Sequence, residues 1–147
     1  MNNRIEELRG YLQPGRHIHL IGIGGVSMAP LAEVLHRQGL CLTGSDINDT
    51  PVTKSLTEQG INVYIGHKAE NVHGADLVVY TVAILPDNPE RMEVARLGIP
   101  NIERATLLGQ LMEGYNHAIN VCGTHGKTTT TSMIAEVLLD VGIDPTV

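Results

Sequence analysis

The stretch Ile18-His19-Leu20-Ile21-Gly22-Ile23-Gly24-Gly25-Val26-Ser27 passes from a short apolar run directly into a glycine-rich turn. The residues after the turn have the periodicity of a helix, because Met28, Leu31, Ala32 and Leu35 fall at positions i, i+3, i+4 and i+7. These four side chains are therefore predicted to be buried against a sheet. A strand, a glycine turn and a helix in this order are typical of a parallel α/β sheet that binds phosphate at the turn.

A second pattern extends this prediction along the chain. A helical segment, a glycine and a short apolar or β-branched run recur in residues 37–42, 58–64 and 96–102. A glycine just after a helix can adopt a positive φ at little cost, so Gly39, Gly60 and Gly98 are predicted to end helices. With further strands at 17–21 and 77–80 and a last helix within 103–116, the fold class is α/β. We expect a Rossmann-like parallel sheet flanked by helices.

The chain is predicted to contain two domains, residues 1–114 and 115–147. The second has an apolar run at 117–122, a new glycine loop and a helix with one apolar stripe. We interpret it as the first strand, P-loop and helix of a second α/β ATPase domain that is truncated at Val147. The stripe is expected to be exposed and to favour self-association; it consists of Met133, Ile134, Val137, Leu138 and Val141.

Composition excludes several classes of function. The net charge is −6, Trp and Phe are absent, and Lys and Arg do not cluster, so nucleic acid is not an expected partner. No run approaches the ~20 apolar residues that span a bilayer, and the start has no apolar export signal, so we expect a cytoplasmic protein without a membrane partner. Cys41 and Cys122 lie in apolar runs and are predicted to be buried free thiols.

The first glycine loop predicts a diphosphate site. Gly22, Gly24 and Gly25 let the backbone approach phosphates closely, although Ser27 stands where the dinucleotide fingerprint has its third glycine. Asp46 is expected at the carboxyl end of the next strand, about 20 residues on, where it could accept hydrogen bonds from ribose hydroxyls. An ordinary tight turn with a solvated aspartate is the alternative. These two features alone would also allow an NAD-dependent oxidoreductase.

The second loop, Gly123-Thr124-His125-Gly126-Lys127-Thr128-Thr129, predicts an ATP site. In a P-loop the backbone N–H groups surround phosphates, the Lys ammonium reaches the outer phosphates and the next hydroxyl coordinates Mg²⁺. Lys127 and Thr128 are therefore the predicted catalytic residues, and Thr128 is the predicted Mg²⁺ ligand. Two phosphate loops imply two phosphorylated ligands, which favours group transfer or ligation over hydride transfer.

Several motifs together resemble the Mur ligase family. They are Gly22-Ile23-Gly24-Gly25, Gly44-Ser45-Asp46, the segments 65–71 and 87–90, and the loop from Gly123 to Thr129. The resemblance implies an enzyme of peptidoglycan synthesis that uses ATP to activate the carboxylate of UDP-N-acetylmuramate as an acyl phosphate, which the amine of L-alanine then attacks. Phosphoryl-group charge would be neutralised by Lys127 and Mg²⁺.

The resemblance also implies the residues that contact the UDP-sugar. Gly24, Gly25 and Val26 would lie on the diphosphate, Ser45 and Asp46 on the ribose, His67 near the UDP, and Ala83 and Ile84 along its groove. The chain departs from the family pattern at Val26-Ser27 and at Pro30, which could displace the helix start. It also has Thr81-Val82 where two serines are usual, so one hydroxyl near the ligand is missing.

Two alternatives within this resemblance stay open. One is the related ligase that attaches a tripeptide to the same UDP-sugar in cell-wall recycling, and the other is a non-catalytic nucleotide-sugar-binding module. Because the remaining parts of the family's active site would lie beyond Val147, this chain alone is expected to bind but not to catalyse.

Overall fold

A computed structural model of the chain describes residues 8–145, which divide into two compact units after Gly114. The assignment of the first unit as a UDP-sugar domain and of the second as the start of an ATP-binding domain stays a prediction. In the first unit five parallel strands form one sheet in the order β3-β2-β1-β4-β5. Their bounds are β1 His17–Ile21, β2 Cys41–Asp46, β3 Asn62–Ile65, β4 Leu77–Tyr80 and β5 Asn101–Glu103. The predicted α/β fold with a parallel Rossmann-like sheet is confirmed.

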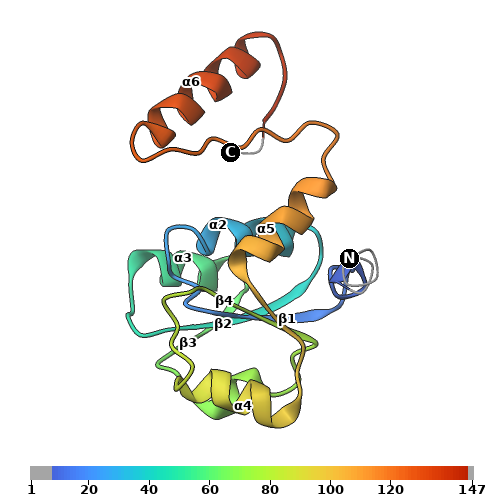
Figure 1. Ribbon diagram of the computed structural model, residues 1–147, viewed down its shortest axis with the longest axis vertical. Coiled ribbons are helices and arrows are strands. Elements are labelled where there is room, and N and C mark those ends of the chain that lie inside the picture. The colour runs from blue at the N-terminus through green and yellow to red at the C-terminus, as the bar shows by residue number, and fades with distance from the viewer. Residues whose placement is uncertain (1–7, 146–147) are drawn as a thin grey trace. The chain divides into compact units, whose positions relative to one another are not determined.

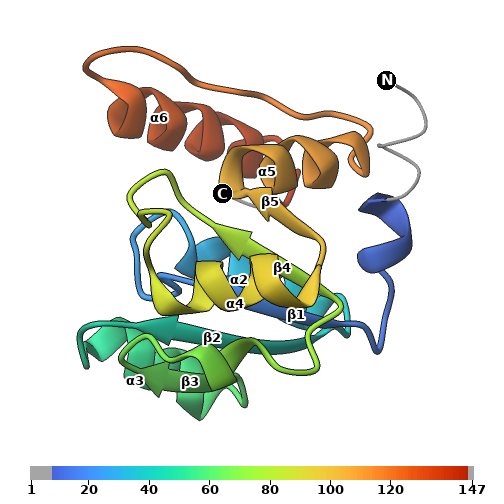
Figure 2. The same cartoon turned by 60° about the horizontal axis from the view of Figure 1, so that its bottom comes forward.

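Helices cover both faces of this sheet (Figures 1 and 2). One face carries α2 (Ala29–Arg37), α3 (Pro51–Glu58) and α5 (Arg104–Glu113), and the other carries α4 (Pro89–Leu97) and the 3₁₀ helix η1 (Ala69–Val72). Residues 8–11 are also helical. Every crossover between parallel strands must pass over a face of the sheet, which explains why the strands alternate with helices along the chain.

The two faces of the sheet differ in chemistry. The α2–α3–α5 face buries a large apolar cluster that includes Ile18, Leu20 and Leu35. The α4 face has a smaller apolar cluster around Ile21, Val78 and Val94, and beside it buried polar side chains. The difference follows from the period of two in a strand, because alternate residues of β1 point to opposite faces: Ile18 and Leu20 to one, His17 and His19 to the other.

The glycines predicted to end helices do so. Gly39, Gly60 and Gly98 have φ values of 84°, 94° and 68°. All four side chains of the predicted helical face, Met28, Leu31, Ala32 and Leu35, are buried. Pro30 does not distort α2, because it lies in the first turn, where a backbone N–H would have no helical acceptor.

The second unit, described by itself, contains the helix α6 (Lys127–Asp140). The predicted strand at 117–122 is not formed; these residues have no regular secondary structure. A strand requires a hydrogen-bonded neighbour, and among residues 115–145 no second extended segment supplies one. The apolar side chains of α6 are not buried, and Met133, Val137 and Val141 are 65%, 63% and 67% exposed.

The cysteine prediction was half right. Cys41 and Cys122 are free thiols, as expected, but both are exposed rather than buried. Cys41 begins β2, before the strand enters the core, and Cys122 lies in the segment that forms no strand.

Candidate functional site

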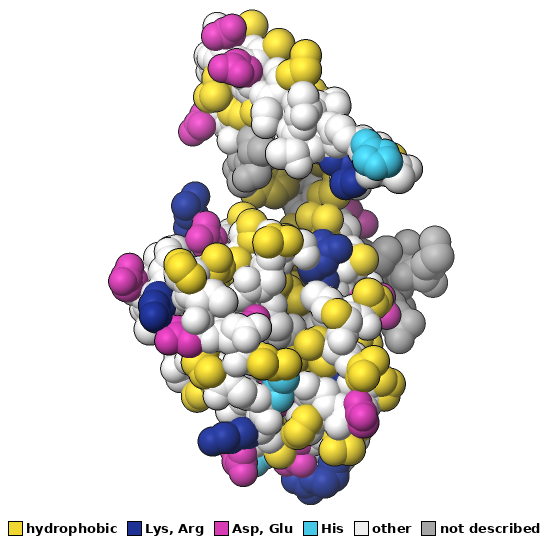
Figure 3. Space-filling view, turned by 90° about the vertical axis from the view of Figure 1, so that its left-hand side faces the viewer, with side chains coloured by type: hydrophobic (Ala, Val, Ile, Leu, Met, Phe, Trp, Pro, Cys, Tyr) yellow, Lys and Arg dark blue, Asp and Glu magenta, His cyan; other side chains and the backbone are white. Residues whose placement is uncertain are grey.

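The loops that follow the strands meet at one edge of the sheet, because all five strands are parallel. These loops are residues 22–28 after β1, 47–50 after β2, 66–68 after β3 and 81–88 after β4. In open α/β sheets, ligands bind at this carboxyl edge, in the crevice where the strand order reverses. Here the reversal lies between β1 and β4. The face that contains these loops is shown in Figure 3.

The glycine loop is held to β2 through main-chain contacts. Gly22 has φ = 80°, and its N–H and that of Ile23 donate to the carbonyl of Ser45 at 2.7 and 3.0 Å. Ile23 then folds over Gly44, where a Cβ atom would lie 2.5 Å from Ile23 Cδ1. Gly44 is therefore required so that the first loop can pack against the second strand.

Asp46 holds the same loop by its side chain. Its Oδ2 accepts a hydrogen bond from Gly24 N–H at 3.0 Å, and its Oδ1 accepts from Asn48 N–H at 3.1 Å. Thr53, at the start of α3, packs on the other side, so a Cβ atom at Gly24 would lie 2.8 Å from Thr53 Cγ2. The carboxylate predicted to bind ribose thus also fixes the position of the glycine loop.

Two N–H groups of the loop are free to bind an anion. Gly25 N–H donates to the carbonyl of Gly22, and Gly24 N–H is used by Asp46. Within residues 8–145, Val26 N–H and Ser27 N–H have no acceptor. They precede α2, and the dipole of that helix favours negative charge at its start. Of the three residues predicted on the diphosphate, Val26 therefore has the available donor, and Ser27 adds a second.

Apolar side chains surround this edge. Val26 is 94% exposed and Val82 is 82% exposed, and hydrophobic side chains are spread across the face shown in Figure 3. Each of the loops after β1, β2 and β4 contributes at least one exposed apolar side chain, and so does the last residue of β3. The set is Val26, Ile47, Ile65, Val82 and Leu85. Such a set on the binding edge is suited to a ligand or a protein surface with apolar parts.

Behind the edge, on the α4 face, lies a buried polar cluster centred on Glu90. Its Oε2 accepts from Ser45 Oγ at 2.6 Å and contacts His67 Nδ1 at 2.9 Å. Its Oε1 accepts from Asn71 Nδ2 at 2.6 Å and lies 3.7 Å from His19 Nε2. Glu90, Ser45 and His19 are completely buried.

The charge of Glu90 is maintained despite this burial. Burial raises the pKa of Glu90, but the ring of His19, 3.7 Å away, and the hydrogen bonds from Ser45 and Asn71 outweigh that effect and hold the pKa below its ordinary value. Its position in the first turn of α4 adds the favourable end of the helix dipole. Glu90 is therefore an ionised carboxylate inside the protein.

The other predicted UDP-sugar residues differ in their surroundings. Ser45 is fully buried, with its hydroxyl bound to Glu90, and its contact with ribose stays a prediction. His67 is partly buried and lies in the loop after β3. Ala83 is exposed, and Ile84 packs near Gly22, while its carbonyl accepts from Arg91 at 2.8 Å. The structure thus brings the glycine loop, Asp46, His67 and Ile84 to one edge.

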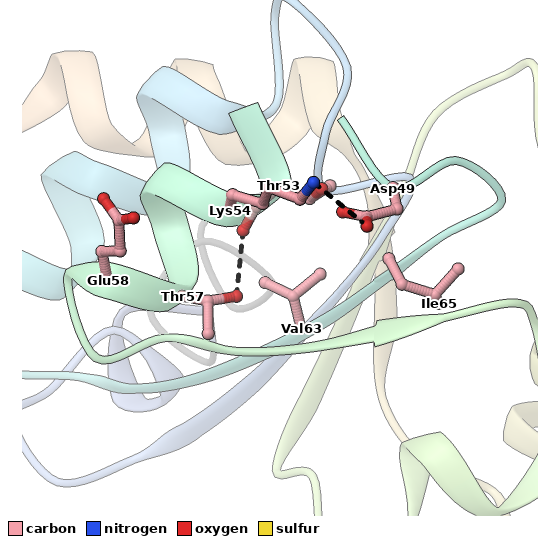
Figure 4. A pocket seen from close by; sticks show the side chains of 7 residues that line it. All are labelled: Asp49, Thr53, Lys54, Thr57, Glu58, Val63 and Ile65. Carbon is pink, nitrogen blue, oxygen red and sulfur yellow. Dashed lines mark hydrogen bonds and ion pairs between the residues drawn. The ribbon is translucent and has the colours of Figure 1, made fainter. Parts of the chain in front are cut away.

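A separate groove of about 430 Å³ lies between α3 and β3 (Figure 4). Val63 and Ile65 point from β3 toward α3, and Lys54 forms an ion pair with Asp49 at 3.4 Å. None of the predicted site residues lines this groove. Thr53 lies between this groove and the glycine loop, because its side chain lines the groove and also packs against Gly24.

The P-loop residues in the second unit have a local geometry that fits phosphates. Gly126 has φ = 77° and precedes α6, whose first-turn N–H groups belong to Lys127, Thr128 and Thr129. Lys127 Nζ donates to the carbonyl of Gly123 at 2.7 Å, and the side chains of His125 and Thr128 are exposed. The ammonium, the start of the helix and the hydroxyl are the groups that the predicted ATP and Mg²⁺ site would use.

Two further observations concern the part of the chain that the structure describes. No helix within residues 8–145 is long and apolar enough to cross a membrane. Over the same residues, His, Cys, Asp and Glu side chains form no group of three that could hold a metal ion.

The fold and the glycine loop define a nucleotide-binding α/β protein, and comparison with known proteins identifies its family. The description of the Mur ligase family, catalytic domain, matches residues 17–116, so the chain belongs to the Mur ligase family. The resemblance drawn from the motifs is confirmed. Membership in this family also argues against the NAD-dependent oxidoreductase that the first loop alone allowed.

Similar proteins agree with this membership. The chain is 52% identical over 132 residues to UDP-N-acetylmuramate--L-alanine ligase of Clostridium botulinum strain Kyoto, matching 90% of this chain and 29% of that protein. Among solved structures, the UDP-N-acetylmuramate-alanine ligase of Thermotoga maritima has a TM-score of 0.80 at 36% identity, over 85% of this chain and 29% of that one. A murein peptide ligase of Psychrobacter arcticus has a TM-score of 0.81 at 33% identity, over 87% and 27%.

The chain thus spans less than a third of the length of these relatives.

Sequence reasoning did not assign a role to Glu90, although it lies in one of the motifs. The signal that could have revealed the buried cluster is the alternation of polar and apolar residues in two strands. His17 and His19 alternate with Ile18 and Leu20, and Thr43 and Ser45 follow the same period in β2.

Proposed function

We propose that this chain is the nucleotide-sugar-binding part of an ATP-dependent ligase that joins L-alanine to UDP-N-acetylmuramate in peptidoglycan synthesis, in the cytoplasm. The observation that carries the proposal is the pair of free N–H groups on Val26 and Ser27 at the start of α2. They lie in a chain that is 52% identical to a protein with this name.

The first unit would bind the UDP-sugar. The N–H groups of Val26 and Ser27 would donate to the diphosphate. Asp46 would hold the glycine loop in position through its hydrogen bond with Gly24 N–H and would accept further hydrogen bonds from the ribose hydroxyls. Ala83 and Ile84 would line the side of the ligand toward β4. Ser45 would act indirectly, because its carbonyl holds Gly22 and Ile23 and its hydroxyl holds Glu90.

The second unit would bind ATP and Mg²⁺ through Gly123, Thr124, His125, Gly126, Lys127, Thr128 and Thr129. Bound ATP supplies the phosphoryl group that activates the sugar's carboxylate. Lys127 Nζ would leave the carbonyl of Gly123, 2.7 Å away, and bind the outer phosphates instead. Thr128 would offer its exposed hydroxyl to Mg²⁺. Catalysis by such groups consists mainly of placing positive charge against the transferring phosphoryl group.

A second candidate is the ligase that attaches a peptide to the same sugar. The murein peptide ligase of Psychrobacter arcticus has a TM-score of 0.81, against 0.80 for the alanine enzyme of Thermotoga maritima. The backbone therefore does not separate the two activities. Sequence identity to these two structures is 36% for the alanine ligase and 33% for the murein peptide ligase, and the relative at 52% identity is an alanine ligase.

Titration calorimetry of this chain with UDP, UDP-N-acetylmuramate, NADH and ATP tests the proposal. We expect the UDP-sugar to bind more tightly than NADH, since the site belongs to a ligase family. Tighter binding of NADH would overturn the proposal in favour of a dehydrogenase. Assays of the full-length enzyme with L-alanine and with the tripeptide then distinguish the two ligases.

A further inference from the structure

Glu90 is fully buried, and the proposed function gives it no task. Moving a carboxylate from water into a protein costs several kcal/mol unless hydrogen bonds compensate. Here the compensation comes from Ser45, Asn71 and His67, with the ring of His19 nearby. Each of these donors must direct a hydrogen at the carboxylate, so the hydrogen bonds to Glu90 determine how the donor side chains are oriented.

The bonds to Glu90 determine which nitrogen of His67 carries a proton. An ionised carboxylate only accepts hydrogen bonds, so Nδ1 of His67, 2.9 Å from Oε2, must be the donor. Ser45 does not change this assignment. Its hydroxyl hydrogen is directed at Glu90 at 2.6 Å, so its oxygen, 3.1 Å from Nδ1, also acts as an acceptor toward His67.

A neutral His67 with a proton on Nδ1 has a lone pair on Nε2. Among the described residues Nε2 has no hydrogen-bond partner. The buried side-chain atoms without a partner are His19 Nε2, His36 Nδ1 and Gln110 Oε1, and because Nε2 of His67 is not among them, it is not buried. The side chain of His67 is 10% exposed. Nε2 is therefore a single acceptor that reaches solvent from an otherwise enclosed ring.

The backbone places this acceptor at the binding edge. His67 follows Gly66, which has φ = 90° and donates its N–H to the carbonyl of Asp46 at 2.7 Å. Asp46 in turn holds Gly24. The histidine and the glycine loop are thus attached to the same residue at the end of β2.

We propose that Glu90 is a positioning residue: it holds His67 in the Nδ1–H tautomer, so that Nε2 accepts a hydrogen bond from a hydroxyl or N–H group of the bound nucleotide sugar. This inference rests on the proposed function for the identity of the ligand. It extends that function, because it assigns a role to a residue that does not touch the ligand.

Nitrogen NMR of the ligand-free chain tests the first half of the proposal. With ¹⁵N-labelled histidine, we expect His67 to show a protonated Nδ1 and an unprotonated Nε2 at neutral pH. In Glu90→Gln the amide can present an N–H instead of an acceptor, so we expect the Nε2–H tautomer to become populated. A wild-type His67 protonated on Nε2, or a tautomer that Glu90→Gln leaves unchanged, would refute the assignment.

Calorimetry with UDP-N-acetylmuramate tests the second half. His67→Asn is the informative variant, because the Asn amide can donate to Glu90 from the position of Nδ1 while the acceptor at Nε2 is lost. We expect it to keep the melting temperature close to that of the unaltered chain and to bind about three- to tenfold more weakly, the range for one neutral hydrogen bond. His67→Gln, whose amide oxygen can occupy the position of Nε2, should recover part of the affinity. Equal affinity of His67→Asn and the unaltered chain would overturn the ligand contact.

The two experiments separate this inference from the proposed function. If the unaltered chain binds no UDP-sugar, the proposed function and the ligand contact both fail, and the tautomer result still decides whether Glu90 positions His67. If the chain binds the sugar and His67→Asn binds it equally well, only the present inference fails.

Discussion

Ile23 lies directly against Gly44, so close that a Cβ atom at Gly44 would be 2.5 Å from Ile23 Cδ1 and 2.9 Å from the carbonyl oxygen of Leu20. This contact joins the glycine loop to the second strand. The shape of the glycine loop therefore depends on a residue about twenty positions further along the chain.

Gly44→Ala should destabilise the first unit by about 1–3 kcal/mol, the usual cost of overpacking. Urea unfolding measures it. The matched control is Gly109→Ala on α5, where an added Cβ meets nothing within 4 Å and φ is not positive. Since alanine is the better helix former, that change should stabilise by about 0.5–1 kcal/mol. Equal effects of the two substitutions would contradict the proposed packing.

Asp46→Asn should weaken binding of UDP-N-acetylmuramate by about tenfold. Both carboxylate oxygens of Asp46 accept main-chain N–H groups, and an amide can replace only one of them, so the loop loses a charge-assisted bond typically worth about 1.5–3 kcal/mol. Calorimetry measures the loss. Glu33→Gln serves as control, because it also removes a negative charge, from α2, without touching the loop. Unchanged affinity of Asp46→Asn would remove Asp46 from the binding site.

Glu90 should make the fold sensitive to acid. Its pKa is lowered in the folded state, so the free energy it contributes is fully present above its unfolded value of about 4.5 and is lost as pH falls through the lower folded value. Glu90→Gln should lower stability at pH 7 by about 2–4 kcal/mol, because the buried donors lose a charged acceptor. The variant should also lose less stability than the wild type as the pH falls below about 4.5. Urea midpoints at several pH values test both statements, and parallel curves would contradict them.

Lys127→Ala should lower the turnover of the full-length ligase by about a hundredfold or more, the typical loss when one preorganised charge-stabilising group is removed. Binding of UDP-N-acetylmuramate should remain nearly unchanged, because the residues proposed for that ligand belong to the other unit. Steady-state kinetics and calorimetry on the same preparation measure the two effects. A variant with normal turnover would exclude Lys127 from the mechanism.

The strands were predicted well because their signal is local. Residues 17–21 and 77–80 are short apolar runs between polar segments, and β1 and β4 have these bounds. The segment 117–122 has a similar composition and forms no strand, because a strand also needs a neighbour and sequence composition does not contain that information.

The site was predicted less completely, for a related reason. Glycine spacing revealed the first loop, since glycine is needed wherever the backbone turns sharply or approaches another segment. Glu90 escaped prediction because a glutamate is rarely buried completely, and only the fold brings Ser45, Asn71 and His67 around it. For the same reason the bond from Ser45 to Glu90 was not predicted, because it depends on the alternation in β2 that turns Ser45 into the α4 face.

The apolar stripe of α6 should make this chain self-associate. Of its five residues, Met133, Val137 and Val141 are each more than 60% exposed, and Ile134 and Leu138 are partly buried. Burying such a side chain typically contributes about 1.5–3 kcal/mol, so the three most exposed residues provide a driving force for pairing with a second copy. Light scattering should show a concentration-dependent increase in mass for residues 1–147 and a monomer for a version that ends at Gly114.

The triple variant Met133→Gln, Val137→Gln, Val141→Gln separates the stripe from the rest of the segment. It keeps the helix and its P-loop, yet should behave as a monomer. If residues 1–147 are monomeric at high concentration, or if the triple variant associates as strongly as the unaltered chain, the stripe is not the contact surface.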